Sequence, residues 1–193
     1  MARQPEIEAA YSAWAERLVA EGYLPYLLTL MFQPLGGSVA SMGERMLDEI
    51  ERVYRLHVTR VVRKPNSLAH MDERPIWFCS LDLPVFKHAK QSRLDVTIND
   101  GLHGHAAGFY HPRSRLRGNL SQHFEERRDL YVQRERPLMR IDVEPIIDRV
   151  GYVVGYGRKN VGRGLISVDA TRILPLDRQT ARARHLSDRA DLT

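Results

Sequence analysis

Residues 94–110 read LDVTINDGLHGHAAGFY, and this stretch decides what kind of sheet the chain can build. The three residues NDG at 99–101 are a strong turn signal, because Asn, Asp and Gly accept the backbone angles of tight turns. The flanking residues, 94–98 and 102–110, are apolar enough to predict two strands. The stretch therefore predicts a hairpin of antiparallel strands.

The rest of the chain shows helical and extended patterns in turn. Residues 41–62 carry apolar side chains at helical spacing, with charges between them, and predict the best helix in the sequence. Further helices are expected at 5–21 and 146–159. Further strands are expected at 26–32, 76–85 and 138–143. This order predicts an α+β domain with a central antiparallel sheet and flanking helices.

The chain has 193 residues and a net charge of +5, from 29 basic and 24 acidic side chains. We expect a helix at 1–22 packed on a domain at 23–175, followed by a polar tail at 176–193. A single cysteine, Cys79, excludes an intramolecular disulfide and a zinc site built from several cysteines. The polar N-terminus is unlike a secretory signal, and no apolar run approaches the roughly 20 residues of a membrane span. We therefore expect a cytoplasmic protein with no membrane partner.

Eight arginines lie between His111 and Arg140, where only four acidic residues oppose them. Guanidinium groups match phosphate oxygens with paired hydrogen bonds, so this segment is a candidate surface for a phosphate backbone. A solvated polar face of the protein would have the same composition.

His103 and His105 are separated by one residue within the predicted strand 102–110. Alternate residues of a strand point to the same face, so the two imidazoles project together, and Gly104 leaves room behind them. Such a pair can hold a divalent cation and leave coordination positions open for substrate oxygens. Two histidines on a sheet face can equally be structural.

Tyr152 and Tyr156 are four residues apart within the predicted helix 146–159 and would lie one turn apart on the same helix face. Tyrosine can act as a nucleophile, although its pKa of about 10 requires a base or a polarised electrophile. Two aromatic residues at this spacing also commonly pack in a core. Gly151 and Gly155 each weaken the helix by roughly 1 kcal/mol relative to Ala, and such glycines often allow another group to approach closely.

Taken together and in order, three segments resemble the motifs of the HUH endonuclease superfamily, in particular the catalytic domain of rolling-circle replication initiators of phages and plasmids. Segment 27–32 (LLTLMF) resembles the first motif, an apolar strand that contains threonine. Segment 102–105 (LHGH) resembles the histidine motif, and 151–156 (GYVVGY), followed by Lys159, resembles the tyrosine motif. The resemblance spans about residues 24–165 and implies an HUH-like sheet with a ferredoxin-like or RRM-like core.

The resemblance implies a metal-dependent endonuclease that nicks single-stranded DNA and transfers the strand through a 5′-phosphotyrosine intermediate. His103 and His105 would bind Mg²⁺ or Mn²⁺. Asp95 is our choice of third ligand, and Asp82 and Asp100 remain alternatives.

The resemblance assigns the first attack on the scissile phosphate to Tyr152 and the return attack to Tyr156. Gly155 departs from the family's pattern, which usually has lysine immediately before the second tyrosine. Arg158 or Lys159 could supply the phosphate-facing cation instead.

The implied substrate is single-stranded or hairpin DNA. The chain has no Walker-type phosphate loop, so helicase activity would have to come from a separate protein. Phe109, Tyr110 or Phe124 could stack on bases, although each is equally compatible with core packing. The DNA backbone is expected to contact Arg113, Arg115, Arg117, Arg127, Arg128 and Arg158. Two alternatives remain open: a non-catalytic DNA-binding module on the same fold, and an unrelated α+β protein that binds other proteins.

Overall fold

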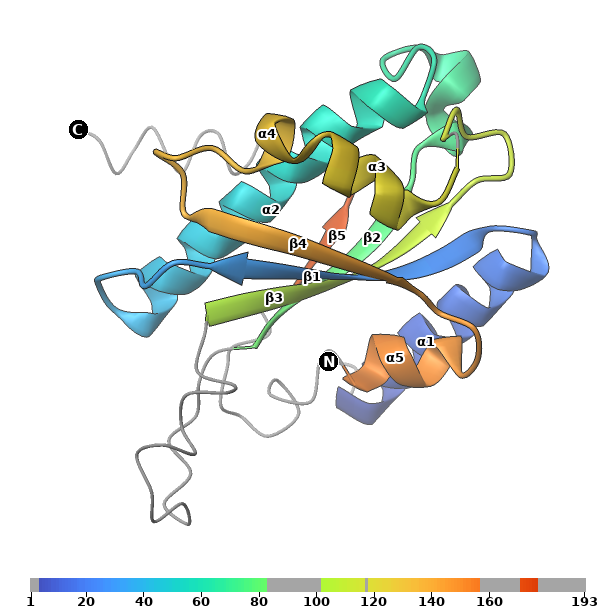
Figure 1. The fold of residues 1–193 in the computed structure, drawn as a ribbon. Helices are drawn as coiled ribbons and strands as arrows, with labels where there is room; N and C mark the ends of the chain where they lie inside the picture. Colours follow the sequence, from blue (N-terminus) through green and yellow to red (C-terminus); the bar gives the residue numbers. More distant parts are fainter. Residues whose placement is uncertain (1–3, 83–101, 117, 157–170, 177–193) are drawn as a thin grey trace.

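The chain builds one sheet of five strands in the order β4-β1-β3-β2-β5 (Figure 1). The computed structural model describes residues 4–82, 102–116, 118–156 and 171–176. Every pair of neighbouring strands runs antiparallel, so the predicted α+β class with a central antiparallel sheet is confirmed. The strands are β1 (Leu24–Phe32), β2 (Ile76–Asp82), β3 (Leu102–Tyr110), β4 (Leu138–Pro145) and β5 (Thr171–Leu174).

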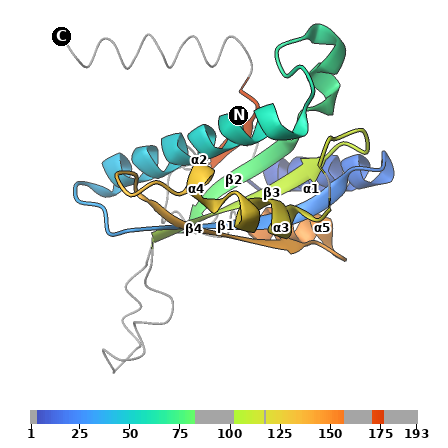
Figure 2. The same cartoon turned by 45° about the horizontal axis from the view of Figure 1, so that its top comes forward.

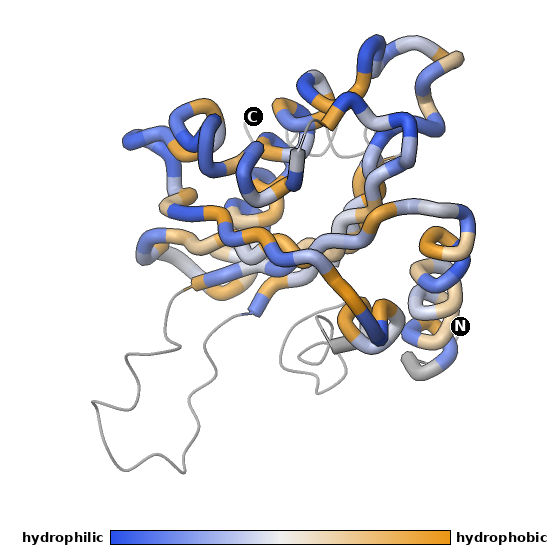
Figure 3. Tube along the Cα trace, turned by 45° about the vertical axis from the view of Figure 1, so that its right-hand side comes forward, coloured by the Kyte–Doolittle hydropathy of each residue, from blue (hydrophilic) through white to orange (hydrophobic). Residues whose placement is uncertain are grey.

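A long amphipathic helix, α2 (Val39–Val61), covers one face of the sheet. The Ser38 hydroxyl accepts a hydrogen bond from the backbone N–H of Ser41, which satisfies one of the unpaired donors at the helix start. The apolar stripe of α2 packs in one cluster with Leu28 and Leu30 of β1. Figure 2 shows α2 lying along the sheet, and Figure 3 shows hydrophilic and hydrophobic positions alternating along the helices.

The opposite face is covered at one end by α1 (Gln4–Ala20) and α5 (Val150–Tyr156), which pack against each other. An apolar cluster joins these two helices to β2 and β3, and it consists of Ala15, Leu18, Phe78, Ala107, Phe109 and Val154. Toward the other end, the same face of β3 carries the half-buried His103 and His105. The fold thus places polar side chains on the part of this face beyond α1 and α5.

Three short helices complete the described chain: the 3-10 helix η1 (Leu68–Glu73), α3 (Leu120–Glu126) and α4 (Arg128–Tyr131). Helices α3 and α4 lie beside α2 and the edge strand β4 (Figure 1). Both fall in the arginine-rich segment, for which the sequence patterns predicted no structure. Within the described ranges, no helix is long and apolar enough to span a membrane.

Most predicted elements occur close to their expected bounds. The helix predicted at 146–159 is wrong at its start, because residues 146–149 are not helical and α5 begins at Val150. Strand β5, which pairs with β2 at the sheet edge, was not predicted. The strand and turn predicted at 94–101 lie outside the described residues, as does the tail from residue 177 onward.

Candidate metal centre

His103 and His105 lie on β3, the central strand, and face the same side of the sheet. Gly104 between them faces the opposite side, where α2 packs. A Cβ atom at Gly104 would lie 2.9 Å from Ile50 Cδ1 and 3.3 Å from Leu81 Cδ2. The missing side chain therefore lets α2 approach the sheet directly behind the two imidazoles.

Asp82 completes a group of three candidate ligands. It ends β2 and pairs directly with His103 in the β2–β3 register, so both side chains lie on one face. Asp82 Oδ2 lies 3.5 Å from His103 Nε2. One ligand atom from each of Asp82, His103 and His105 lies within 4.8 Å of the other two, and all three residues are half-buried. This group could hold a metal ion.

The spacing of the three groups can be compared with the spacing that a bound ion requires. A divalent ion with bonds of about 2.1 Å holds its ligand atoms about 3.0–3.5 Å apart. Asp82 and His103 are already 3.5 Å apart, and small side-chain rotations would bring all three groups, which lie within 4.8 Å of one another, to this spacing. Two imidazole nitrogens and one carboxylate oxygen suit several divalent metals, among them Mn²⁺, Fe²⁺ and Zn²⁺.

Thr29 of β1 pairs with His105 from the other side of β3. Its Oγ1 lies 3.2 Å from His105 Nδ1, which is within hydrogen-bonding distance. A hydrogen bond at Nδ1 orients the ring and leaves Nε2 as the nitrogen that would bind an ion. The sequence pattern marks Thr29 only as the threonine of segment 27–32 and predicts no role for it.

A groove of about 800 Å³ runs from the histidines to the edge strand β4. Residues from both faces of β4 line it, because α3 and α4 pack beside this strand. Within the groove, Arg140 Nη2 lies 2.8 Å from Asp142 Oδ2. Arg128 of α4 and Glu144 of β4 also line the groove, so it carries charges of both signs.

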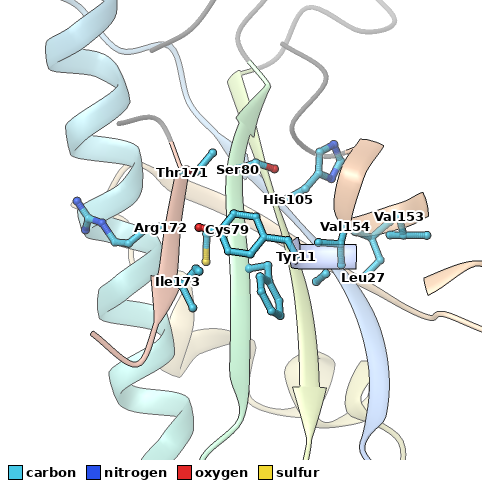
Figure 4. Close-up of a pocket in the computed structure, with 12 residues that line it drawn as sticks. Tyr11, Leu27, Cys79, Ser80, His105, Val153, Val154, Thr171, Arg172 and Ile173 are labelled. Atoms are coloured by element: carbon cyan, nitrogen blue, oxygen red, sulfur yellow. The ribbon is translucent and has the colours of Figure 1, made fainter. Parts of the chain in front are cut away.

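Helix α5 lies next to His105. Val153 and Val154 of α5 line a small cavity of about 20 Å³ together with His105 and Tyr11 (Figure 4). Tyr152, the preceding residue, is 64% exposed. The alternative interpretation of Tyr152 as a core residue is therefore wrong.

The two glycines of α5 differ in their surroundings. A Cβ atom at Gly151 would lie 2.8 Å from Glu16 Oε1 and 3.2 Å from Ser12 Cβ. The Ser12 hydroxyl also donates a hydrogen bond of 3.0 Å to the Gly151 carbonyl. A Cβ atom at Gly155 would come no closer than 3.9 Å to Ser12 Oγ, its nearest described neighbour. The close approach expected at these glycines thus occurs at Gly151, and the approaching group is helix α1.

Several predicted site residues fall outside the described part of the chain. They are Asp95, Asp100, Arg117, Arg158, Lys159 and the side chain of Tyr156. Asp82, one of the alternatives to Asp95, is the carboxylate that the described residues bring to the histidines.

The arginines expected to contact DNA lie on different surfaces. Arg115 and Arg127 line a pocket on the α2 face of the sheet. Arg128 lines the groove beside β4. Arg113 lies near η1, where its Nε is 3.9 Å from Glu73 Oε1.

The candidate stacking residues are all in the core. Phe109, Tyr110 and Phe124 are between 0% and 4% exposed, so core packing, and not base stacking, explains them. Cys79 is also buried. Burial raises the pKa of the Cys79 thiol, which disfavours the nucleophilic thiolate.

A buried polar network joins α2, α3 and α4 and was not predicted. The Tyr131 hydroxyl lies 3.1 Å from His57 Nδ1 and 2.9 Å from His123 Nε2. Burial, and then the nearby His123, lower the pKa of His57 well below its usual range. Burial also lowers the pKa of His123 to about 4, with Arg127 as the next cause. In the sequence, His57 lies within the apolar stripe of the helix predicted at 41–62, and this pattern gives no sign of the network.

No protein-family model, curated protein or solved structure matches this chain. The geometry of the site is therefore the basis for assigning a function.

Proposed function

We propose that the protein is a metal-dependent endonuclease that nicks single-stranded DNA and transfers the strand through a 5′-phosphotyrosine intermediate, as the resemblance to HUH endonucleases implies. The observation that carries the proposal is the group of Asp82, His103 and His105 beside helix α5. His105 shares a cavity with Val153 of α5 and a close polar contact with Thr29 of β1. The three segments that resemble the family's motifs thus meet around one histidine.

In this proposal, Asp82, His103 and His105 hold Mg²⁺ or Mn²⁺. Bound there, the ion would polarise the scissile phosphodiester and offset the negative charge that develops on it. The mixed nitrogen and oxygen donors are compatible with Mn²⁺, and half-burial leaves the three groups accessible to a phosphate from the solvent side.

Tyr152 is the proposed nucleophile. Its phenol oxygen forms a bond to phosphorus and its proton passes to water, while the bond between phosphorus and the 3′ oxygen breaks and that oxygen takes up a proton. One phosphodiester replaces another, so the strand can later be rejoined. Tyr156, one helical turn further along α5, would carry out the return attack.

A covalent-adduct assay tests the proposal. Single-stranded oligonucleotides that tile both strands of the protein's own gene and its flanks are labelled at the 3′ end. They are incubated with the protein in Mn²⁺ or in EDTA. We expect a Mn²⁺-dependent band on a denaturing gel in which the labelled DNA migrates with the protein. The same oligonucleotides labelled at the 5′ end should give a shortened free product.

Three variants separate the roles in this assay. Tyr152→Phe should lose the adduct and keep its DNA affinity, because only the nucleophilic oxygen is removed. Asp82→Asn should lose the adduct through weaker metal binding. Tyr11→Phe is the matched control, because Tyr11 lines the cavity beside His105 but has no role in the proposed step. Normal cleavage by Tyr152→Phe, with none by Tyr156→Phe, would transfer the first attack to Tyr156.

The remaining outcomes favour the two alternatives. DNA binding without any adduct would indicate a non-catalytic DNA-binding module on this fold. Neither binding nor adduct would indicate an α+β protein that binds other proteins.

A further inference from the structure

A second hollow, of about 830 Å³, lies on the α2 face of the sheet, opposite the candidate metal ligands. It forms where the end of α2 meets the segment before α3 and the junction of α3 with α4. It is lined by Arg60, Ser114, Arg115, Leu116, His123, Glu126 and Arg127.

Positive charge dominates this pocket. Three guanidinium groups line it with a single carboxylate, that of Glu126. Arg127 Nη1 lies 3.6 Å from Glu126 Oε2. Within the described ranges, Arg60 and Arg115 have no ion-pair partner. Arg127 lowers the pKa of His123, Glu126 raises it and Arg60 lowers it, so all three charges act on the same side chain.

The pocket is held in place by hydrogen bonds to α2. The backbone N–H of Arg115 donates a hydrogen bond of 2.8 Å to the Val61 carbonyl, and the Ser114 hydroxyl donates one of 3.3 Å to the same carbonyl. On the opposite wall, the Tyr131 hydroxyl fixes His123 at 2.9 Å. These contacts fix the backbone of the pocket and the His123 ring, from which the exposed arginine side chains extend.

We propose that this pocket binds a phosphate group. Arginines from α2, from the segment before α3 and from the α3–α4 junction line the same pocket, and guanidinium groups from several sides suit an anion with oxygens pointing in several directions. The site goes beyond the proposed nicking activity and does not depend on it, because no candidate metal ligand lines it.

The test is calorimetric titration of the full chain with inorganic phosphate, at constant ionic strength and with EDTA present. EDTA removes any metal ion, so the candidate metal centre contributes no phosphate binding. We expect the double variant Arg60→Ala/Arg115→Ala to lose at least tenfold in phosphate affinity. Both side chains are exposed, so the fold should be retained, and a thermal melt checks this.

Two further variants sharpen the result. Arg17→Ala/Arg55→Ala removes the same charge from exposed arginines that do not line the pocket, and it should bind phosphate as the wild type does. Glu126→Gln removes the one carboxylate among the described residues that line the pocket and should strengthen phosphate binding severalfold. Equal affinity in both double variants, or no binding by the wild type, would overturn the proposal.

Competition with a fluorescent single-stranded oligothymidylate distinguishes two sources of the phosphate. One result is that phosphate displaces the oligonucleotide and that Arg60→Ala/Arg115→Ala binds the oligonucleotide at least tenfold more weakly than the wild type does. In that case the pocket holds a backbone phosphate of the DNA. If that variant loses phosphate binding but keeps its oligonucleotide affinity, the pocket holds a free phosphorylated molecule. Both results support a phosphate site.

Discussion

At the scale of single residues, Thr29 is within hydrogen-bonding distance of His105, one of the candidate metal ligands. Its Oγ1 lies 3.2 Å from His105 Nδ1. Partners of this kind set the orientation and tautomer of a metal-binding histidine. We therefore expect Thr29 to act as a positioning residue for the proposed metal site, through its hydroxyl and not through its side-chain shape.

Thr29→Val should weaken Mn²⁺ binding by roughly 10-fold to 100-fold, the range typical of lost second-layer contacts to metal ligands. Valine keeps the β-branched shape of threonine, so strand β1 should be retained. Thr29→Ser restores the hydroxyl and should restore most of the affinity. Calorimetric titration of each variant with Mn²⁺ measures both effects. Equal affinities for the Val and Ser variants would show that the hydroxyl has no such role.

The candidate ligands differ in how far the sequence could predict them. His103 and His105 follow from strand periodicity alone, because alternate residues share a face. The sequence favours Asp95 because it lies eight residues before His103 on the preceding predicted strand of the hairpin, whereas Asp82 lies on another strand. Asp82 comes to His103 only through the β2–β3 register, which pairs residues 21 positions apart. Turn and hydropathy signals do not determine a register across such a long connection.

Among the elements, the helices on the α2 face are joined by the network of His57, Tyr131 and His123. A histidine whose pKa is lower in the folded than in the unfolded chain takes up a proton on unfolding. Its contribution to stability is complete above the unfolded pKa of about 6.5 and is lost as the pH falls toward the folded pKa. The window for His123 runs from about pH 6.5 down to about 4.

The free energy of unfolding should therefore fall between pH 6.5 and 4, by at most about 1.4 kcal/mol per pH unit for each of the two histidines. Half-exposed His123 should contribute less than this limit, because solvent screens its charge. His57→Phe keeps an aromatic ring stacked on Phe124 and removes the buried titrating group, so its stability should depend less on pH. Urea unfolding of both proteins between pH 7 and 4.5 measures this. Parallel pH profiles would contradict the assignment.

Elements differ in predictability for physical reasons. The long stripe of α2 indicates a helix because many apolar positions repeat with one period. Strand β5 has only four residues and includes Arg172, whose side chain is 1% exposed. Figure 4 shows Arg172 directed away from His105 and toward α2. There its Nη1 lies 2.9 Å from Glu51 Oε2 and 3.0 Å from Asp48 Oδ1. The ion pairs of this buried arginine are formed with a helix that is more than 100 residues away along the chain. The local sequence around Arg172 therefore does not indicate a strand.

At the scale of the whole molecule, the edge strand β4 connects two surfaces. The candidate metal centre lies on one face of the sheet and the arginine-lined pocket on the other. The groove beside β4 includes residues from both faces, with Arg140 on the strand and Arg128 on α4. Arg128 is the chain neighbour of Arg127, which lines the pocket. A single strand of DNA that passes around β4 would meet Arg140 and Arg128 on its way to the pocket, beside the carboxylates that also line the groove.

This path predicts how salt affects DNA binding. Each phosphate neutralised on a single strand contributes about −0.7 to the slope of log affinity against log salt concentration, because bound counterions are released. Removing two contacts in Arg128→Ala/Arg140→Ala should therefore flatten the slope by about 1.4. Fluorescence anisotropy of an oligothymidylate in EDTA, at several salt concentrations, measures the slope without nicking. Arg17→Ala/Arg55→Ala removes the same charge elsewhere and should leave the slope unchanged. If both double variants flatten it equally, the effect is one of net charge, and the strand does not pass around β4.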